Sequence, residues 1–353
     1  MSNYQAESKE RDIQRLREIQ QELPDFLRVF FVGIAQTTSP KTRLAYAYDL
    51  RVFFRYLFEE HRVLGGVERK DLTVSSLESI ESEDIDYFLE YLSYYIAPDY
   101  ENPENATERH NENKGKSRKL AAIRSMFNYF YKKKKIPANP AAIVDTPKHH
   151  EKQIVRLDVN EMADFLDSVE FGNHLTEREK VHHERYKVRD LALTTLLLGT
   201  GIRVSECVGI NIKDIDFRNN AIRIIRKGGD EVFIYFGDEV ETALRAYLEQ
   251  RLQAVTKEEN EEALFLSSQG KRIQVRSVQK LVKKYTQGVT SKKISPHKLR
   301  STYGTNLYHE TGDIYLVADA LGHSDVNTTK KHYAEIEDAQ RRRASTKIKL
   351  RKD

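Results

Sequence analysis

Apolar side chains recur at helical spacing in the first 137 residues. One set follows the i, i+3, i+4, i+7 pattern that places apolar side chains on one helix face: Leu50, Phe53, Phe54 and Leu57. The spacing returns at Ile85, Phe88, Leu89 and Leu92 and at Leu120, Ile123, Phe127 and Phe130. Ser39-Pro40 predicts the start of the first helix, and Ser82 is the expected N-cap of the second.

Polar segments set the expected limits of this region. The segment 97–113 is polar and is expected to be a loop, so a helical domain is predicted over residues 20–137. The sequence IPANPAAIVDTPKHHEKQ (136–153) holds three prolines and lacks apolar periodicity. That composition is typical of a linker, which we place at 138–153. Residues 154–353 form the second predicted domain.

The second domain combines helical patterns with one β insertion. AIRII (221–225) and EVFIYF (231–236) are rich in residues that favour strands, and RKGGD between them predicts a hairpin turn. Residues 276–285 predict a further helix with one apolar and one polar face. The predicted fold class is mainly α: an N-terminal helical bundle and a C-terminal mixed α/β domain with a small antiparallel β insertion. Two such lobes suit a rod-shaped ligand, such as duplex DNA, better than a small molecule.

Composition narrows the class of protein. The 353 residues are 39% hydrophobic, which is enough for two domains with cores. No apolar run is long enough for a transmembrane helix, and the charged first 20 residues lack the apolar stretch of a signal peptide. The one cysteine, Cys207, has no partner for an internal disulfide, so we expect a reduced, cytosolic setting.

The formal net charge is only +4, but the charges are unevenly distributed. Four segments are basic: 114–119, 132–135, 341–343 and 347–352. The stretch 78–112 is mostly acidic. Clustered basic segments favour a polyanionic partner, whereas a lysine run at a helix end is also typical of a solvated face. Charge alone leaves both interpretations open.

The second domain holds, in order, the residue types that cleave a phosphodiester without a metal. This reaction needs a nucleophile, cations that neutralise the phosphorane, and an acid for the leaving oxygen. Arginine suits the second role because its planar guanidinium binds phosphate oxygens with paired hydrogen bonds. The candidates are Arg203 in TGIRVSE, Lys227 in RKGGD, His297 and Arg300 in HKLR, and His323 and Tyr333 in LGHSDVNTTKKHY.

Each candidate stands at a predicted turn or helix start. Arg203 follows a glycine turn at a helix start, where backbone N–H groups favour an anion. Lys227 lies at the tip of the predicted hairpin, and His297 and Arg300 share one helix face. Each motif alone also fits a structural role or chance, but the ordered set matches one reaction.

With the motifs G-I-R-x-S-E, K-G-G, H-x-L-R and L-G-H followed by a tyrosine, the sequence resembles a tyrosine recombinase of the phage-integrase and Xer family. The resemblance covers nearly the whole chain. It implies a core-binding, SAM-like helical DNA-binding domain over 20–137 and a catalytic domain over 154–353. The stretch DLTVSSLESIESEDIDYFLEYL (71–92) is most similar to Xer enzymes that work as a single recombinase.

The resemblance implies covalent catalysis by a phenol. Tyr333 would attack the scissile phosphate, giving a 3′-phosphotyrosyl bond and a free 5′-hydroxyl, and Lys227 would protonate the departing oxygen. A phenol with a pKa of about 10 is mostly protonated at neutral pH, so it needs nearby cations and a proton acceptor. The phosphotyrosyl ester keeps the free energy of the phosphodiester. No ATP, metal or other cofactor is therefore expected, and Glu206 is expected to orient neighbouring basic groups.

The remaining motif residues would act on the phosphate or on the tyrosine. The resemblance implies that Arg203 and Arg300 hold the non-bridging oxygens. His297 would assist proton transfer at the tyrosine, and His323 would donate a hydrogen bond to the phosphate.

Other residues with reactive side chains are expected to be structural. Three tyrosines between the motifs are expected to pack in the core: Tyr303, Tyr308 and Tyr315. The pairs His149-His150 and His182-His183 stand in polar surroundings, where adjacent histidines are usually exposed, so no metal site is expected.

Both domains are expected to contact double-stranded DNA. One polar helix face suits a major groove: Arg276, Gln279, Lys280 and Lys283. Basic residues of the first domain suit the DNA backbone: Lys41, Arg43, Lys116, Arg118 and Lys119. The resemblance implies a homotetramer on two DNA sites, with a dimer at each, and a C-terminal tail donated to a neighbouring protomer.

Several functions remain open at this point. A site-specific recombinase could resolve chromosome dimers at a dif-like site, or integrate and excise a mobile element. A DNA-binding regulator could keep the fold without the chemistry, although the complete residue set argues against it. A type IB topoisomerase would share the attack chemistry but relax supercoils without requiring a particular sequence.

Overall fold

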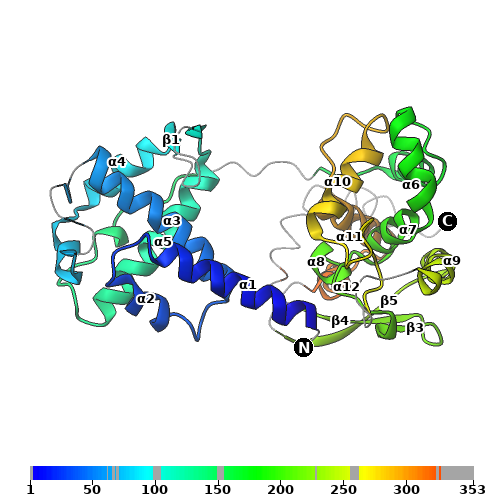
Figure 1. Ribbon diagram of the computed structural model, residues 1–353, viewed down its shortest axis with the longest axis horizontal. Coiled ribbons are helices and arrows are strands. Elements are labelled where there is room, and N and C mark those ends of the chain that lie inside the picture. The colour runs from blue at the N-terminus through cyan, green and yellow to red at the C-terminus, as the bar shows by residue number, and fades with distance from the viewer. Residues whose placement is uncertain are drawn as a thin grey trace, which may run out of the picture. The chain divides into compact units, whose positions relative to one another are not determined.

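Helices make up most of the chain and gather in two compact units (Figure 1). The N-terminal unit spans Ser2–Glu151 and the C-terminal unit spans Lys152–Asp353. The computed structural model describes residues 3–61, 63–65, 68, 71–97, 105–148, 155–226, 229–254, 262–322 and 326.

The N-terminal unit consists of helices and one short hairpin. Its elements are α1 Asn3–Gln20, α2 Leu27–Gly33, α3 Pro40–Arg55, the π-helical η1 Tyr56–Glu60, the 3-10 helix η3 Val74–Ser79, α4 Ser82–Tyr91, β1 Tyr95–Ala97, β2 Thr107–Arg109, α5 Asn113–Lys132 and the 3-10 helix η5 Pro140–Ala142. The start of α3 is confirmed, because the Ser39 hydroxyl accepts a hydrogen bond from the backbone N–H of Thr42 at 3.1 Å. For α4 the predicted N-cap is wrong by one residue. Glu81 is the cap, and its backbone N–H donates to the Asp84 carboxylate at 2.7 Å.

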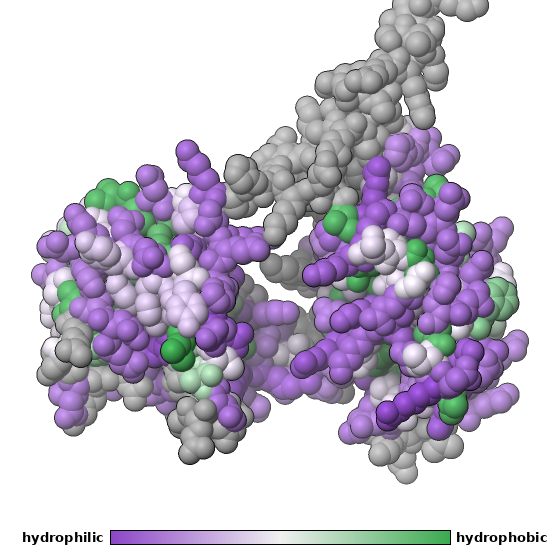
Figure 2. All heavy atoms as spheres, turned by 90° about the horizontal axis from the view of Figure 1, so that it is seen from above, coloured by the Kyte–Doolittle hydropathy of each residue, from purple (hydrophilic) through white to green (hydrophobic). Residues whose placement is uncertain are grey.

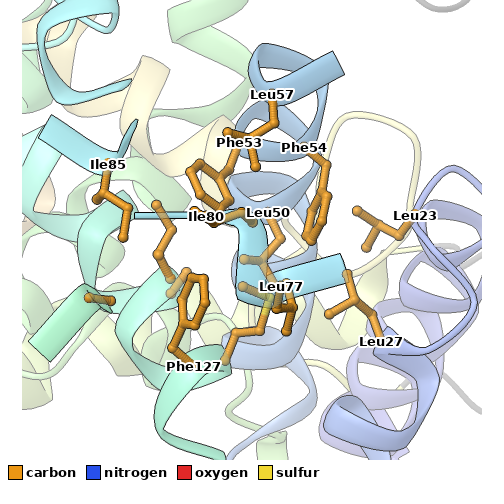
Figure 3. Close-up of a cluster of buried hydrophobic side chains, with 14 of the residues drawn as sticks. Leu23, Leu27, Leu50, Phe53, Phe54, Leu57, Leu77, Ile80, Ile85 and Phe127 are labelled. Atoms are coloured by element: carbon orange, nitrogen blue, oxygen red, sulfur yellow. The ribbon is translucent and has the colours of Figure 1, made fainter. Parts of the chain in front are cut away.

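The three predicted apolar faces meet in one core (Figure 3). All twelve residues that share the helical spacing are buried, and Leu50, Phe53 and Phe127 are fully so. Edge-to-face aromatic pairs fill much of the interior, such as Phe53 with Phe88 at 5.0 Å between ring centroids. Such pairs stabilise a core by about 0.5–1.5 kcal/mol beyond the area that they bury.

The N-terminal unit differs from the expectation at its edges. α1 packs against α3 and buries Leu16 and Ile19, so the unit begins well before residue 20. The expected loop 97–113 instead contains β2, which pairs antiparallel with β1. All three residues of β2 are exposed, so no apolar alternation signals the strand.

Part of the expected linker packs on the N-terminal unit. Ala141 and Val144 belong to its core. The Arg124 guanidinium of α5 donates to the Ala141 carbonyl at 3.1 Å and to the Thr146 hydroxyl at 2.7 Å. Apolar periodicity could not reveal this packing, because one arginine holds a segment that has no regular repeat.

The C-terminal unit surrounds one long helix. Its elements are α6 Val159–Phe171, α7 Glu177–Thr200, α8 Val204–Cys207, the 3-10 helix η6 Ile212–Asp214, β3 Ile215–Asp216, β4 Ala221–Ile225, β5 Glu231–Tyr235, α9 Asp238–Gln253, α10 Val275–Thr286, α11 Pro296–Thr311 and α12 Ile314–Leu321. Helix α7 packs against α6, α9 and α11. Eleven of its residues are buried, which suits a helix that is covered on several sides.

The β insertion of this unit is a three-stranded antiparallel sheet in the order β3-β4-β5. The predicted hairpin is confirmed, with Ile222 opposite Ile234 and Ile225 opposite Glu231. The two-residue strand β3 is too short to leave a sequence pattern. The mainly α fold class with a small antiparallel insertion is confirmed.

Hydrophilic residues dominate the visible surface of both units (Figure 2). Exposed apolar side chains are scattered among them, such as Val32 of α2 and Phe233 of β5. Among the helices of the described residues, none combines the length and the apolar character that a membrane crossing requires.

Candidate active site

The site begins where α7 ends. Gly201 has a φ of 61° and forms the left-handed C-cap of α7, and a Cβ there would overlap the ring of Tyr303. Two residues later the chain reaches Arg203, the N-cap of α8. The predicted glycine turn ahead of Arg203 is therefore confirmed, and it delivers this side chain at the junction of two helices.

Glu206 fixes Arg203 from two directions. The Arg203 guanidinium donates to Oε1 of Glu206 at 2.9 Å, and its backbone N–H donates to Oε2 at 3.0 Å. The expectation that backbone N–H groups at this helix start bind an anion is not supported. α8 spans only four residues, and the amide of Arg203 is already bonded. The carboxylate of Glu206 thus orients the cation, and the Arg203 side chain remains 34% exposed.

Arg300 connects the end of α7 to the end of α12. Its side chain leaves α11 and is buried. One guanidinium nitrogen donates to the carbonyl of Gly201 at 2.6 Å, and the other donates to the carbonyl of Leu321. Arg300 thereby joins Gly201, which lies 99 positions before it, to Leu321, which lies 21 positions after it.

Arg203 and Arg300 converge on neighbouring carbonyls. Arg203 Nη2 donates to the carbonyl of Gly322 at 2.9 Å, next to the Leu321 carbonyl that Arg300 bonds. These carbonyls end α12, where the helix dipole is negative and cations are stabilised. The structure thus brings the two predicted phosphate-binding arginines together, directly before His323 in the chain.

A third guanidinium lies at the same place, and the motifs did not indicate it. Arg226 follows β4, and its Nη2 lies 3.4 Å from the Asp319 carbonyl and 3.5 Å from the Ala320 carbonyl. We call Arg203, Arg226 and Arg300 the arginine cap of α12. The position of Arg226 directly before Lys227 in RKGGD was the signal in the sequence that could have indicated it.

Of the four remaining catalytic candidates, the structure describes His297 alone. His297 is the second residue of α11 and is exposed. Three candidates lie outside the described residues: Lys227, His323 and Tyr333. The structure describes their neighbours Arg226 and Gly229, which flank residues 227–228, and Gly322, which precedes His323.

A second polar cluster lies within the same unit, and we call it the Asp190 cluster. The buried carboxylate of Asp190 accepts hydrogen bonds from Arg189 at 2.6 Å and from the Tyr285 hydroxyl at 2.9 Å. Lys284 Nζ lies 3.8 Å from the same carboxylate. His183 completes the cluster, with Nδ1 3.0 Å from the Tyr285 hydroxyl. The cluster joins α7 to α10.

Burial governs the protonation of this cluster. Burial, together with the negative charge of Asp190, raises the pKa of Tyr285. Burial and the nearby Lys284 ammonium lower the pKa of His183. The expectation that both members of the His182-His183 pair are exposed is wrong for His183, because its ring reaches Tyr285 on another helix.

Two other predictions can be compared with the structure. Tyr308 is buried and Tyr303 packs beside it, as expected. Tyr315 is 72% exposed, so its prediction is wrong, because the buried face of α12 consists of Val317, Ala318 and Leu321. In the described part of the chain, no three His, Cys, Asp or Glu side chains form a cluster that could hold a metal ion. His149 and His150 lie outside it.

The predicted DNA-contact residues of the C-terminal unit share an exposed helix face. Helix α10 buries one side through Val278, Leu281, Val282 and Tyr285. The polar candidates are all exposed: Arg276, Gln279, Lys280 and Lys283. The helix therefore presents a basic face while the Asp190 cluster holds its opposite face to α7.

The predicted contacts of the N-terminal unit are less uniform. Lys41 is exposed, Arg43 and Lys116 are half-buried, and Arg118 is exposed. Arg118 pairs at 2.6 Å with the buried carboxylate of Asp49, and burial raises the pKa of that carboxylate to about 6. Lys119 does not lie at the surface with the other candidates, because it is buried and donates to Asn111 at 2.9 Å.

Comparisons with known proteins give a consistent set of similarities. A sequence profile of the Phage integrase family matches residues 165–340. Tyrosine recombinase XerC of Caldanaerobacter subterraneus subsp. tengcongensis is 35% identical over 335 residues, covering 93% of this chain and 86% of that protein. Tyrosine recombinase XerC of Pelobacter propionicus is 30% identical over 315 residues, covering 88% and 91%.

A solved structure is similar in fold. It is the crystal structure of the XerH site-specific recombinase bound to a palindromic difH substrate in a post-cleavage complex. The TM-score is 0.62 at 20% sequence identity, and the match covers 91% of this chain and 83% of that chain.

Proposed function

The chain belongs to the phage integrase family of tyrosine recombinases, and from this premise we propose how its residues divide the work of cutting and rejoining DNA. The protein is a site-specific DNA recombinase of the tyrosine type, and it is Xer-like. Double-stranded DNA is its partner and substrate.

Tyr333 is the nucleophile of the proposed scheme. Its phenolic oxygen attacks the scissile phosphorus, the bond from phosphorus to the 5′-oxygen breaks, and Lys227 gives a proton to that leaving oxygen. The phosphate remains on Tyr333 as a 3′-phosphotyrosyl ester. Attack by a 5′-hydroxyl of another strand reverses these steps, so rejoining needs no ATP.

The arginines stabilise the charge that develops on the phosphate. Arg203 and Arg300 bind the non-bridging oxygens, where the pentavalent phosphorane carries more negative charge than the ground state. His297 assists proton transfer at the tyrosine, and His323 donates a hydrogen bond to the phosphate. Donors fixed in place before the reaction stabilise the transition state without reorganising.

One observation supports this assignment most strongly. Arg203 and Arg300 come from helices far apart in the sequence, yet their guanidinium groups donate to the neighbouring carbonyls of Gly322 and Leu321. Two cations meeting directly before His323 fit a single phosphate between them. The same convergence would be unnecessary in a DNA-binding regulator without chemistry.

The assembly is also part of the proposal. Strand exchange between two duplexes requires one nucleophile for each strand cut, which a homotetramer on two DNA sites provides, with a dimer on each site. Resolution of chromosome dimers is the biological task that we propose, because the two relatives named above are XerC recombinases that cover most of this chain. The alternative is integration and excision of a mobile element.

A trapping experiment tests the chemistry. The bound duplexes are first selected from fragments of the host genome by the full-length protein. Each is then prepared with a nick near the cleaved position, so that a short strand diffuses away and rejoining fails. The expected result is a covalent protein–DNA adduct on a denaturing gel.

Two variants make the result specific. Tyr333→Phe should bind the duplex unchanged and form no adduct, whereas Tyr315→Phe, which alters an exposed tyrosine of α12, should form it normally. An adduct with Tyr333→Phe would assign the nucleophile to another residue. Binding without any adduct in the parent protein would favour the regulator, and relaxation of plasmids that lack the selected site would favour a type IB topoisomerase.

The biological task has a separate test. Positions bound across the host genome distinguish the two candidates. A single site for each chromosome is expected for dimer resolution, whereas sites at the ends of a mobile element would favour the integrase.

A further inference from the structure

Arg226 differs from Arg203 in what holds it. Within the described residues no carboxylate pairs with its side chain, and its Nε is buried without a hydrogen-bond partner. Arg223, on the same stretch of chain, pairs instead with Asp214 at 2.6 Å. Arg226 is half-buried, and desolvating part of a guanidinium without a carboxylate partner is costly, so its position needs another explanation.

The explanation lies at the end of α12. The last carbonyls of a helix lack the N–H partners four residues ahead that earlier carbonyls have, and the negative end of the helix dipole attracts cations. In α12 the Asp319 carbonyl accepts a hydrogen bond from the backbone N–H of Gly322 at 2.7 Å. Arg226 directs its guanidinium at the carbonyls of Asp319 and Ala320, while Arg300 and Arg203 bond the next two. The three guanidinium groups together cover four consecutive carbonyls.

Gly322 shows how closely Arg226 approaches this end. Its φ of 59° places it in the left-handed region, where it forms the C-cap of α12. A Cβ on Gly322 would overlap Nη1 and Cζ of Arg226. The glycine suits the left-handed backbone conformation, and a side chain at this position would displace the Arg226 guanidinium.

We propose that Arg226 is a positioning residue for strand cleavage: its guanidinium packs on Gly322 and fixes the end of α12, from which the chain continues to His323. It also ties this end to the hairpin turn, because Lys227 is the next residue. Arg226 therefore sets the relative position of the general acid and the phosphate-binding histidine. This inference rests on the function proposed above.

Substitution of Arg226 separates positioning from binding. Arg226→Gln should lower the single-turnover cleavage rate constant about 10- to 100-fold at saturating DNA, with the Kd for DNA changed by no more than about twofold. Arg226→Lys should recover part of the rate, because a cation near the helix end returns without the planar fork. Arg223→Gln is the matched control, and its cleavage rate should equal that of the parent protein.

A double-mutant cycle tests the contact itself. Gly322→Ala carries both the backbone strain and the overlap with Arg226, whereas in an Arg226→Ala background only the strain remains. The rate penalty of Gly322→Ala should therefore be at least about fivefold smaller in that background. Equal penalties in both backgrounds would overturn the inference.

The inference about Arg226 can be wrong even if the proposed function is right. If the parent protein forms the covalent adduct and Arg226→Gln cleaves at the same rate, Arg226 has no positioning role but the recombinase chemistry stands. If Arg226→Gln loses DNA binding in proportion to its loss of cleavage, the residue acts in binding and the inference is again wrong. If the parent protein forms no adduct, the function itself is wrong.

Discussion

Two groups of cations in the C-terminal unit are held in opposite ways. In the Asp190 cluster, a fully buried carboxylate lies between Arg189 and Lys284. In the arginine cap, the Arg203 guanidinium pairs with the carboxylate of Glu206, and all three guanidinium groups lie against main-chain carbonyls at the end of α12. The first group sets one carboxylate against two cations, whereas the second sets one carboxylate against three, so the arginine cap keeps the larger surplus of positive charge.

The difference indicates which group serves structure and which serves chemistry. A carboxylate cancels the charge of its partner, so removing it leaves a buried cation uncompensated. A carbonyl oxygen accepts a hydrogen bond and fixes the direction of a guanidinium, but the positive charge remains. An arginine oriented in this way can stabilise the added negative charge of a phosphorane.

The largest expected effect concerns the Asp190 cluster. Asp190→Ala should lower the free energy of unfolding by about 3–5 kcal/mol, because Arg189 and Lys284 lose their buried partner. Chemical denaturation followed by far-UV circular dichroism measures this change. Glu249→Ala, at an exposed position of α9, should change it by less than about 0.5 kcal/mol. A loss for Asp190→Ala that is as small as the control would remove the contrast between the two groups.

The next effect concerns the surplus charge. Arg203→Ala should lower the single-turnover cleavage rate constant about 10²- to 10³-fold, the cost of removing one donor that stabilises developing charge. Arg245→Ala, which removes an exposed arginine paired with Glu241, is the control and should cleave normally. Cleavage by Arg203→Ala at the rate of the control would show that the charge of the arginine cap is not used.

A smaller effect is expected inside the Asp190 cluster. Tyr285→Phe removes the hydroxyl that bonds both Asp190 and His183, and it should lower the free energy of unfolding by about 1–3 kcal/mol. Denaturation in parallel with Asp190→Ala measures it. A loss equal to that of Asp190→Ala would mean that the hydroxyl, and not the ion pairs, dominates the cluster.

The smallest expected effect is a pH dependence. Because burial lowers the pKa of His183, the unfolded chain takes up a proton below about pH 6.5 while the folded protein does not. Stability should therefore fall as the pH decreases through that range, by at most about 1.4 kcal/mol per pH unit. His183→Gln should flatten this slope between pH 7.5 and 5.5. An unchanged slope would mean that His183 takes up its proton equally in both states.

The sequence was sufficient where the cause of structure is local. The apolar spacing around Phe53, Phe88 and Phe127 predicted three helices that share a core, because helical periodicity depends on neighbouring residues alone. The glycine turn before Arg203 and the hairpin of β4 and β5 were likewise predictable.

The sequence was insufficient where the cause is distant. Arg226 meets α12 across 93 residues, and His183 meets Tyr285 across 102. Neither contact leaves a periodic pattern, so Arg226 was overlooked and His183 was expected at the surface. Strand β2 escaped prediction for another reason, since its exposed residues have no apolar face.

The central claim is that the arginine cap holds positive charge available to the scissile phosphate, and a substrate without that negative charge tests it most directly. Single-turnover cleavage by the parent protein and by Arg203→Ala is compared on two duplexes that differ only in one non-bridging oxygen, which a methyl group replaces. The defect of Arg203→Ala should be at least about tenfold smaller on the neutral methylphosphonate, because less charge needs stabilising. An equal defect on both substrates would contradict the claim.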